Sequence, residues 1–244
     1  MKMDNHAFED SDSDQWNWQV SHPYIGRTEK ELLFSFRPYI CFPFLEVGCG
    51  QGTNLVHLGE ALTGFTIGID LSLNRLRYSK KKFPKAIFIC ARAEQLPIRT
   101  RSIGFTLIRD GLHHFDDPLA VLRDVGRMSK DSASAFVLEP NGMNPLMAAW
   151  AIAAKFDRGI LKNSPKHLRT LFSRANLPLP VEFFSQALPI SRVFFHYRFG
   201  FPNAAKYFSL LIRFAEKIAE FVLPRKMHAY LGYLFPSILA QDKP

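Results

Sequence analysis

The stretch FLEVGCGQG at residues 44–52 decides the fold. Apolar residues lead into it and a helical pattern begins near Asn54, so its glycines lie on the turn between a buried strand and a helix. Gly48, Gly50 and Gly52 permit positive φ angles there and let the backbone approach a ligand closely. The start of the helix adds unpaired N–H groups. The stretch therefore predicts a ligand loop in a doubly wound α/β fold.

The spacing of the glycines indicates which ligand. The dinucleotide fingerprint is G-x-G-x-x-G, whereas this loop reads E-x-G-x-G-x-G, with Glu46 just upstream. A carboxylate in that place repels a phosphate and suits an amino group. A second acid, Asp70, ends the apolar segment 65–70, where doubly wound folds place the carboxylate that accepts hydrogen bonds from ribose. The two acids provide for both halves of an adenosyl amino acid.

With these residues the chain resembles the class I S-adenosylmethionine-dependent methyltransferases, in particular the branch with a methyltransferase type 11-like domain, which acts mostly on small molecules and lipids. The likeness runs from about residue 16 to residue 177. It implies a doubly wound, Rossmann-like α/β fold with a mostly parallel seven-stranded sheet, helices on both faces and a helical C-terminal insertion. It also implies S-adenosyl-L-methionine as cofactor. Residues 16–27 resemble the family's N-terminal helix that closes over the cofactor, with ordinary packing as the alternative.

The resemblance also implies a set of cofactor-binding residues. In the family the glycine loop wraps the methionine part and the ribose, the first acid helps to hold the amino group, and the second acid binds the ribose. The segment after the third strand lies along the adenine ring, and the loop after the fourth strand faces cofactor and acceptor. These roles fall on Glu46, Gly48, Cys49, Gly50, Gly52, Asp70, Leu71, Arg92, Ala93, Glu94, Arg109 and Asp110. For Arg109 and Asp110 an ion pair is the alternative to cofactor contact.

One position departs from the family pattern. The residue before Ala93 is usually an aspartate that accepts a hydrogen bond from the adenine amino group, and here it is Arg92, which has only donors. Either a backbone carbonyl or another side chain replaces that contact, or cofactor affinity is reduced. Losing one such bond typically costs about 1–3 kcal/mol.

Two histidines follow the expected fourth strand, at the sheet edge where doubly wound folds bind ligands. His113 and His114 are candidates for a general base toward a hydroxyl acceptor, because an imidazole accepts a proton near neutral pH. Packing or helix capping is the alternative. Glu139 and Asn141 lie at the end of the expected fifth strand, where an acceptor-binding role and a structural role are both open. Methyl transfer asks little of side chains, since positioning for in-line attack supplies much of the rate.

The cysteines bear on metal binding and on the cellular compartment. The chain has an odd number of cysteines: Cys41, Cys49 and Cys90. Their spacing is not that of metal ligands, so no metal centre is predicted, and this use of cysteine favours a reducing cytoplasm. No apolar run follows the first six residues, so a secretory signal is not expected. The prediction is a cytoplasmic protein that touches membranes at most peripherally.

The net charge of +9 is unevenly placed. Residues 1–149 hold 17 Lys and Arg against 17 Asp and Glu, whereas residues 150–244 hold 14 against 5. Basic and aromatic residues interleave in the second part, as in residues 192–201. This pattern predicts an anionic partner: a membrane surface, an acidic lipid headgroup or, less favoured, a nucleic acid.

Residues 206–223 carry apolar side chains at helical spacing, interrupted by too many charges for a transmembrane span. The alternatives are a helix packed on its own domain, an interfacial membrane helix, and a surface for a partner or nucleic acid. A seventh strand is expected near residues 234–240. The expected organisation is an N-terminal cap over 1–35, a cofactor-binding core over 36–185, and a basic, aromatic, helical insertion with the last strand over 186–244.

The predicted function is transfer of a methyl group from S-adenosyl-L-methionine to an O, N or C nucleophile of a small-molecule or lipid-like acceptor. The motifs that serve amino groups of bases (Asn/Asp-Pro-Pro-aromatic) and pyrimidine rings (Pro-Cys) are absent from the sequence. Two alternatives stay open. One is an RNA-binding or RNA-modifying protein that uses the basic C-terminal part, and the other is a cofactor-impaired scaffold of the same fold, prompted by Arg92.

Overall fold

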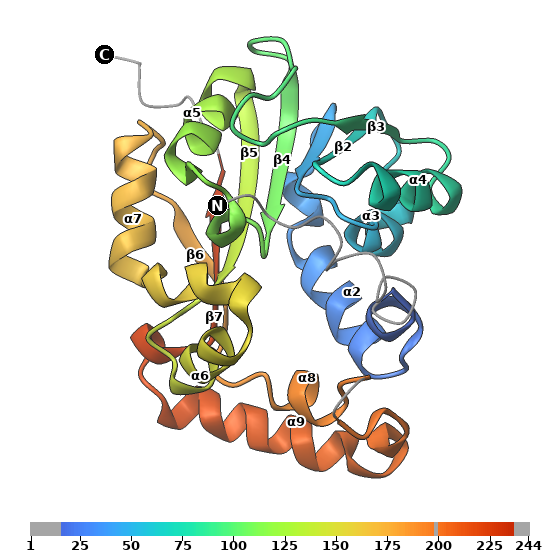
Figure 1. The fold of residues 1–244 in the computed structure, drawn as a ribbon, viewed down its shortest axis with the longest axis vertical. Helices are drawn as coiled ribbons and strands as arrows, with labels where there is room; N and C mark the ends of the chain where they lie inside the picture. The colour runs from blue at the N-terminus through green and yellow to red at the C-terminus, as the bar shows by residue number, and fades with distance from the viewer. Residues whose placement is uncertain (1–15, 198–199, 237–244) are drawn as a thin grey trace.

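The protein is built around a seven-stranded sheet in the order β3-β2-β1-β4-β5-β7-β6 (Figure 1). The computed structural model describes residues 16–197 and 200–236. The first five strands pair in parallel, and β7 is antiparallel to both β5 and β6. The strands are β1 (Phe44–Val47), β2 (Thr66–Asp70), β3 (Ile87–Cys90), β4 (Ile103–Arg109), β5 (Ser129–Pro140), β6 (Val181–Gln186) and β7 (Tyr230–Phe235). The predicted mostly parallel sheet is confirmed.

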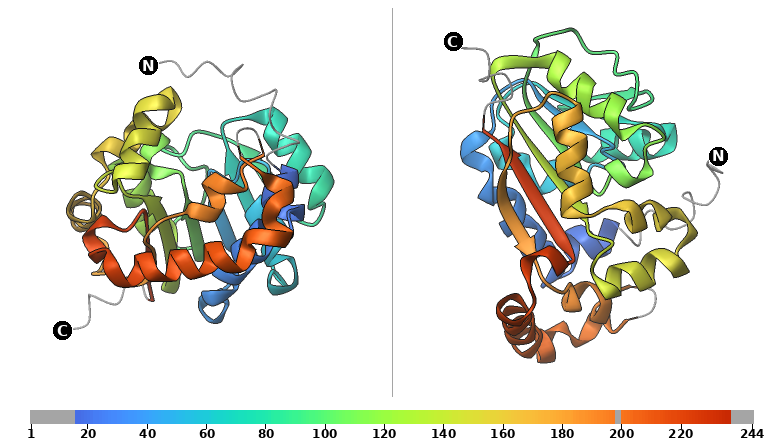
Figure 2. Two further views of the ribbon diagram at one scale, coloured as in Figure 1. Left: turned by 90° about the horizontal axis from the view of Figure 1, so that it is seen from below. Right: turned by 90° about the vertical axis from the view of Figure 1, so that its left-hand side faces the viewer.

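Helices cover both faces of the sheet (Figure 2). The α-helices are α2 (Ile25–Ser35), α3 (Thr53–Leu58), α4 (Leu73–Lys82), α5 (Pro118–Met128), α6 (Pro145–Ala153), α7 (Pro165–Arg174), α8 (Ile190–Phe194) and α9 (Ala205–Val222). Short helical turns are η2 (Asn17–Ser21), η3 (Arg37–Tyr39), η4 (Gly59–Ala61), η5 (Leu112–His114), η6 (Lys155–Lys162), η7 (Pro202–Ala204) and η8 (Arg225–Met227). Among the described residues, no helix is both long and apolar enough to cross a membrane.

Three of the helices begin as their sequences predict. A polar residue accepts a hydrogen bond from the first turn, and a proline, whose missing N–H costs nothing there, follows it. Asp117 caps α5, Asn144 caps α6 and Ser164 caps α7. The three caps therefore fix where α5 begins after β4, where α6 begins after β5 and where α7 begins before β6.

Each face of the sheet has its own core. On one face α2 and α3 cover phenylalanines of the central strands, and Phe36 stacks on Phe136 with ring centroids 4.6 Å apart. On the other face α5 and α7 cover β4, β5 and β7, where Phe172 meets Tyr233 edge to face at 5.3 Å. Burying one such side chain contributes about 1.5–3 kcal/mol, so the two layers hold the strand ends in fixed positions.

The last strand lies earlier than the sequence predicted. It runs over Tyr230–Phe235 rather than 234–240, and residues 237–240 lie outside the described part of the chain. Both segments are apolar, so hydropathy does not separate them. Within the strand, Gly232 passes close to β5: a Cβ there would lie 2.7 Å from the ring of Phe136. The predicted helix near 206–223 is confirmed as α9, in the insertion between β6 and β7.

Candidate functional site

The glycine loop leaves β1 and turns into α3. Gly48, Gly50 and Gly52 all have positive φ angles, of 75°, 51° and 75°, which L side chains rarely adopt. A Cβ added at Gly50 would meet nothing within 4 Å, so the loop backbone borders open space there. At Gly52 a Cβ would lie 3.2 Å from Ser79, so this third glycine faces α4 rather than the open space.

Asp70 ties the glycine loop to the end of β2. One carboxylate oxygen accepts from the backbone N–H of Gly50 at 2.9 Å and the other from that of Ser72 at 2.8 Å. A carboxylate accepts about four hydrogen bonds, so both oxygens keep room for ligand hydroxyls. Capping of α4 falls to the side chain of Ser72, which accepts from Arg75 N–H, and not to Asp70.

Glu46 is buried with half of its carboxylate unsatisfied. Its Oε1 accepts from Asn54 Nδ2 at 2.6 Å, while Oε2 has no hydrogen-bond partner among the described residues. Burial raises the pKa of Glu46 to about 8. An unpartnered buried acceptor is costly unless a ligand satisfies it, and a cationic amino group is the ligand that would lower that pKa again.

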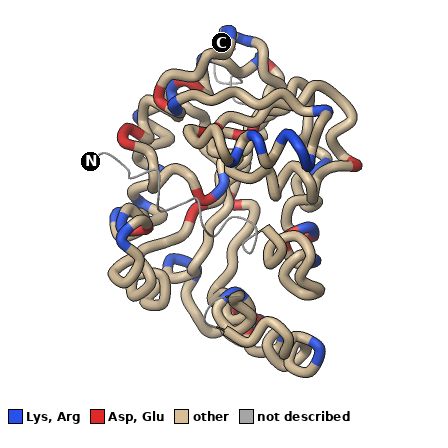
Figure 3. The backbone as a smooth tube through the Cα atoms, turned by 45° about the vertical axis from the view of Figure 1, so that its right-hand side comes forward, with Lys and Arg blue, Asp and Glu red and all other residues tan. Residues whose placement is uncertain are grey.

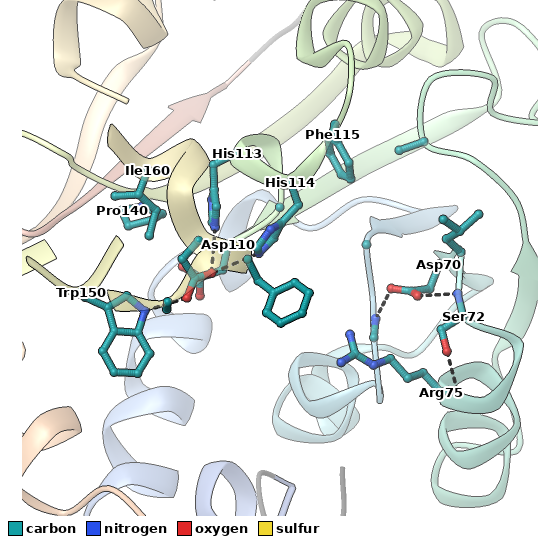
Figure 4. Close-up of a pocket in the computed structure, with 18 of the residues that line it drawn as sticks. Asp70, Ser72, Arg75, Asp110, His113, His114, Phe115, Pro140, Trp150 and Ile160 are labelled. Atoms are coloured by element: carbon teal, nitrogen blue, oxygen red, sulfur yellow. Dashed lines mark hydrogen bonds and ion pairs between the residues drawn. The ribbon is translucent and has the colours of Figure 1, made fainter. Parts of the chain in front are cut away.

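Two cavities meet at the loop. The larger has a volume of about 1260 Å³ and lies along the carboxyl ends of the strands (Figure 4). Of the predicted cofactor residues it is lined by Gly48, Gly50, Asp70, Leu71, Arg92, Ala93, Glu94 and Asp110. A smaller hollow of about 130 Å³ is lined by Cys49 and Arg109, among others, and by Asn54, the partner of Glu46. Glu46 and Gly52 line neither cavity themselves.

Arg92, the residue that departs from the family pattern, is neutralised by acids. Its Nη2 lies 2.8 Å from a carboxylate oxygen of Asp116 and its Nε lies 3.5 Å from Glu94. The other oxygen of Glu94 accepts from the backbone N–H of Asp116 at 2.9 Å. The segment after β3 is thereby joined to the loop after η5, and carboxylate oxygens stand beside the guanidinium at this part of the cavity wall.

Two arginines share one buried glutamate behind the site. Arg109 from β4 and Arg192 from α8 both donate to the carboxylate of Glu29 on α2. Burial alone would raise the pKa of Glu29, but the two guanidinium groups hold it below its usual value. Arg109 also donates to Asn54 at 2.9 Å and lies 3.5 Å from Asp110. Of the two alternatives for Arg109, the structure contains the ion pair.

The two histidines have different surroundings. His113 is almost fully buried, with Nδ1 2.7 Å from Glu139 and Nε2 3.7 Å from Asp157. Burial opposes its charge, but the carboxylates prevail and raise the pKa of His113 to about 10. Glu139 also accepts from the backbone N–H groups of Gly111 and Leu112, both at 2.8 Å. Glu139 therefore fixes the His113 ring and the loop that carries it.

His114 stays neutral beside this charge. Burial and the neighbouring His113, whose ring centroid is 4.0 Å away, lower the pKa of His114 to about 4. Its Nε2 lies 3.6 Å from Asp157, whose other oxygen accepts from Trp150 Nε1 at 2.6 Å. His114 is the more accessible of the two rings, with 26% of its side chain exposed against 3% for His113. One histidine is thus charged and held, and the other is neutral and open to the cavity (Figure 4).

No metal centre was predicted, and that prediction stays untested. Ligand atoms of His113, His114 and Asp157 lie within 4.8 Å of one another, a spacing that a metal ion also uses. The imidazolium of His113 already lies beside both carboxylates, 2.7 Å from Glu139 and 3.7 Å from Asp157. We therefore interpret the group as an ion pair. Asp157 was missed at the level of sequence because it lies on η6, more than 40 residues after the histidines.

The far end of the cavity is aromatic. It draws on segments that are distant in the sequence: η2 near the N-terminus, η5, α6, η6, α8 and β7. Trp18 of η2 is anchored by a hydrogen bond from Nε1 to the carbonyl of Phe195 at 2.7 Å. The aromatic side chains lining this end are Trp18, Trp150, Phe156, His196 and Tyr230. Phe115 also lines the cavity, but its ring lies beside Gly48 of the glycine loop.

Comparison with known proteins supports the same family. Residues 45–137 match the family model described as a methyltransferase domain. The demethylmenaquinone methyltransferase of Chlorobaculum tepidum is 25% identical over 154 residues, which cover 61% of this chain and 62% of that protein. That of Halalkalibacterium halodurans is 32% identical over 102 residues, covering 39% and 42%. The chain thus matches less than two thirds of the length of these curated relatives.

Solved structures share the fold over nearly the whole chain. A SAM-dependent methyltransferase of Thermotoga maritima superposes with a TM-score of 0.65 at 17% identity, covering 96% of this chain and 98% of that one. One from Archaeoglobus fulgidus gives 0.63 at 15% identity, covering 90% and 98%. The chain carries a methyltransferase domain on a class I methyltransferase fold, and the resemblance drawn from residues 44–52 is confirmed.

Proposed function

We propose that this protein is an S-adenosylmethionine-dependent methyltransferase acting on a small-molecule acceptor with an aromatic, quinol-type ring. The observation that carries the proposal is the pair of carboxylates around the glycine loop. Asp70 holds the open loop backbone, and Glu46 keeps a buried oxygen without a partner. The methyltransferase domain over residues 45–137 supports it.

The residues present fit the cofactor. Glu46 would take the amino group, the loop at Gly48 and Gly50 the methionine part, and Asp70 the ribose hydroxyls. The segment from Arg92 to Glu94 would lie along the adenine ring. When bound, S-adenosylmethionine supplies a methyl group that its positive sulfur has already activated.

The scaffold alternative rested on Arg92, and the surroundings of Arg92 weaken it. Because Asp116 and Glu94 neutralise the guanidinium, this wall of the cavity still offers carboxylate oxygens as acceptors. We infer that one of them replaces the missing aspartate toward the adenine amino group. The RNA alternative has less support, since the curated relatives are named for methylation of demethylmenaquinone.

A ring-shaped acceptor suits the far end of the cavity. About 1260 Å³ exceeds the usual 300–1000 Å³ of a single small-molecule site, so cofactor and acceptor fit together. Aromatic side chains such as Trp150 and Tyr230 pack well against a planar apolar ring. The names of the relatives favour a reduced naphthoquinone over an amine as the first acceptor to test.

The two histidines would have different roles toward the acceptor. His114 is neutral and accessible, so we assign it the role of accepting a hydrogen bond from the acceptor hydroxyl and orienting it. His113 is a positioning residue whose positive charge, 4.0 Å away between ring centroids, favours the acceptor anion that forms. Glu139 keeps that charge in place.

The test is methyl transfer from isotopically labelled S-adenosylmethionine to a reduced demethylnaphthoquinone with a short prenyl tail. We expect a singly methylated product by mass spectrometry and a His114→Ala variant that binds the cofactor normally but turns over at least about tenfold more slowly. Calorimetry with S-adenosylhomocysteine reports binding separately from turnover. Folded native protein that binds neither form of the cofactor would overturn the proposal.

A further inference from the structure

The long helix α9 turns an apolar face to the outside. The buried residues of α9 are Ala205, Ile212 and Ala219, two of which have small side chains. The opposite side, which we call the outer face, is strongly exposed: Phe221 by 93%, Leu210 by 81% and Phe214 by 64%. The outer face comprises Tyr207, Leu210, Leu211, Phe214, Ile218 and Phe221.

The arrangement is the reverse of an ordinary surface helix. At 3.6 residues per turn the outer face fills a sector of about 100° that points away from the buried side. A surface helix of a globular protein normally presents polar residues there. In the same protein α5 does so, since Arg123 and Arg127 are exposed while Val121 and Val125 are buried. In Figure 3 α9 is the long helix at the bottom, and its Lys, Arg and Glu positions are coloured along it.

Cations border the outer face along one flank. Lys206, Arg213 and Lys217 follow one another at helical spacing and are all exposed. The one exposed acid of α9 is Glu220, because Glu216 turns inward and accepts from the N–H and Oγ of Ser191 at 2.8 and 2.7 Å. Lipid-interacting helices that lie in the plane of a membrane combine an apolar face with basic residues at its border.

We propose that the outer face of α9 docks in the headgroup region of an anionic lipid bilayer. The helix has 18 residues and is therefore about 27 Å long, and it would lie flat, with its apolar side chains among the acyl chains and its cations at the phosphates. Exposed apolar side chains are thereby removed from water, and the basic flank meets the charge it attracts.

The helix α9 lies near the acceptor end of the cavity through the side that faces α8, opposite its outer face. α8 lies between them: Phe194 packs on Phe208 of α9 with ring centroids 5.8 Å apart, while Arg192 and Val193 line the cavity. A lipid-like acceptor could therefore pass from the bilayer into the site past α8. Only this last step rests on the proposed function, since docking itself needs neither cofactor nor acceptor.

The test is binding of the full chain to sedimenting vesicles, without cofactor. We expect binding to phosphatidylglycerol–phosphatidylcholine vesicles at least about tenfold stronger than to phosphatidylcholine alone. Phe214→Glu/Phe221→Glu should lower that binding at least about tenfold, because both rings leave the acyl region. Replacing Arg213 and Lys217 by Gln should lower it about fivefold per cation, and only on anionic vesicles.

A matched control separates docking from general loss of apolar surface. Phe65 and Leu179 are exposed by 54% and 81% outside α9, so Phe65→Glu/Leu179→Glu should bind vesicles as the native chain does. Calorimetry with S-adenosylhomocysteine shows that each variant is folded and reports on the cofactor site independently. No vesicle binding by native protein would overturn the proposal. So would a native dimer that the α9 variant converts to monomer, which would assign the face to a second copy, or RNA binding lost in the same variant.

Discussion

The two ends of the cavity are held in different ways. At the cofactor end, short segments that follow β1, β2 and β3 present mainly backbone, with Asp70 fixing the loop through two N–H groups. At the acceptor end, side chains from the whole length of the chain meet, and buried charges such as Glu139 and His113 fix them. A ligand shared by many enzymes is thus met by a local motif, whereas the variable ligand is met by side chains that only the complete fold assembles.

Removing Asp70 should give the largest effect, a loss of cofactor binding. Asp70→Ala deletes both acceptors that hold the loop and, in the proposed function, the acceptor for the ribose hydroxyls. Loss of charged hydrogen bonds at about 1.5–3 kcal/mol each predicts at least about 100-fold weaker cofactor binding. Calorimetry with S-adenosylmethionine and S-adenosylhomocysteine measures it. Asp117→Ala is the matched control, because that carboxylate also accepts a backbone N–H, at 3.0 Å, but caps α5. Equal losses in both variants would contradict a special role for Asp70.

The acceptor end should respond to Glu139→Gln without any change at the cofactor end. The variant removes the main charge that keeps His113 protonated, so we expect kcat to fall about 10- to 100-fold while cofactor affinity is kept. With its pKa near 10, His113 in native protein stays charged until the pH approaches that value. In the variant the charge, and with it the activity, should be lost at lower pH. Coinciding kcat profiles across pH 6–10 would show that Glu139 does not act through His113.

The same ion pair contributes to stability in a defined pH window. The pKa of His113 is about 10 in the folded protein and about 6.5 in an unfolded chain, so its contribution is complete below pH 6.5 and is lost as the pH rises through 10. The difference in free energy of unfolding between native protein and Glu139→Gln should therefore shrink from pH 6 to pH 10. Urea unfolding at several pH values measures it, with Glu182→Gln on β6 as control.

Glu46 gives a smaller, pH-dependent effect at the cofactor end. Its pKa near 8 means that at pH 7 the free carboxyl is mostly protonated, whereas an ammonium ligand favours the charged form. Binding should therefore release a proton, and affinity should rise by up to about tenfold per pH unit below pH 8 and then level off. Calorimetry in buffers of different ionisation enthalpy counts the proton. Glu46→Gln should release none, and unchanged release in that variant would place the proton elsewhere.

The smallest effect concerns metals, where we expect none. If Asp157 pairs with the charged His113, beside a neutral His114, then no metal is needed at this group. A chelator should then leave kcat unchanged, and purified protein should hold no stoichiometric metal. Elemental analysis before and after chelation is the measurement. If each chain instead holds one metal ion, and His114→Ala removes that ion, then the group is a metal centre and not an ion pair. The two histidines would then both be metal ligands.

Sequence alone predicted the glycine turn after β1 and the acid at the end of β2 because these signals are local. The glycines of residues 44–52 and the acid at Asp70 lie where strand ends meet a ligand in any doubly wound sheet. The partners of Asp157 and Arg192 carried no such signal, since each of these residues acquires its partner only through tertiary packing. The strand after α9 was predicted too late in the chain because residues 230–240 are apolar over most of their length, so hydropathy does not fix where the strand begins. The assignments of individual site residues and the division at residues 35 and 185 stay predictions.

The position of β7 has a consequence for biosynthesis. β7 lies between β5 and β6, yet the ribosome makes it after both, and 43 residues separate the end of β6 from its start. Until Phe235 has left the exit tunnel, β5 and β6 each expose an open edge that invites pairing with another chain. A nascent chain can already shape its glycine loop at that stage, while α9 presents its apolar face to water or to a nearby bilayer. Pausing of translation beyond α9 would therefore be the moment at which this chain most needs a chaperone or a membrane.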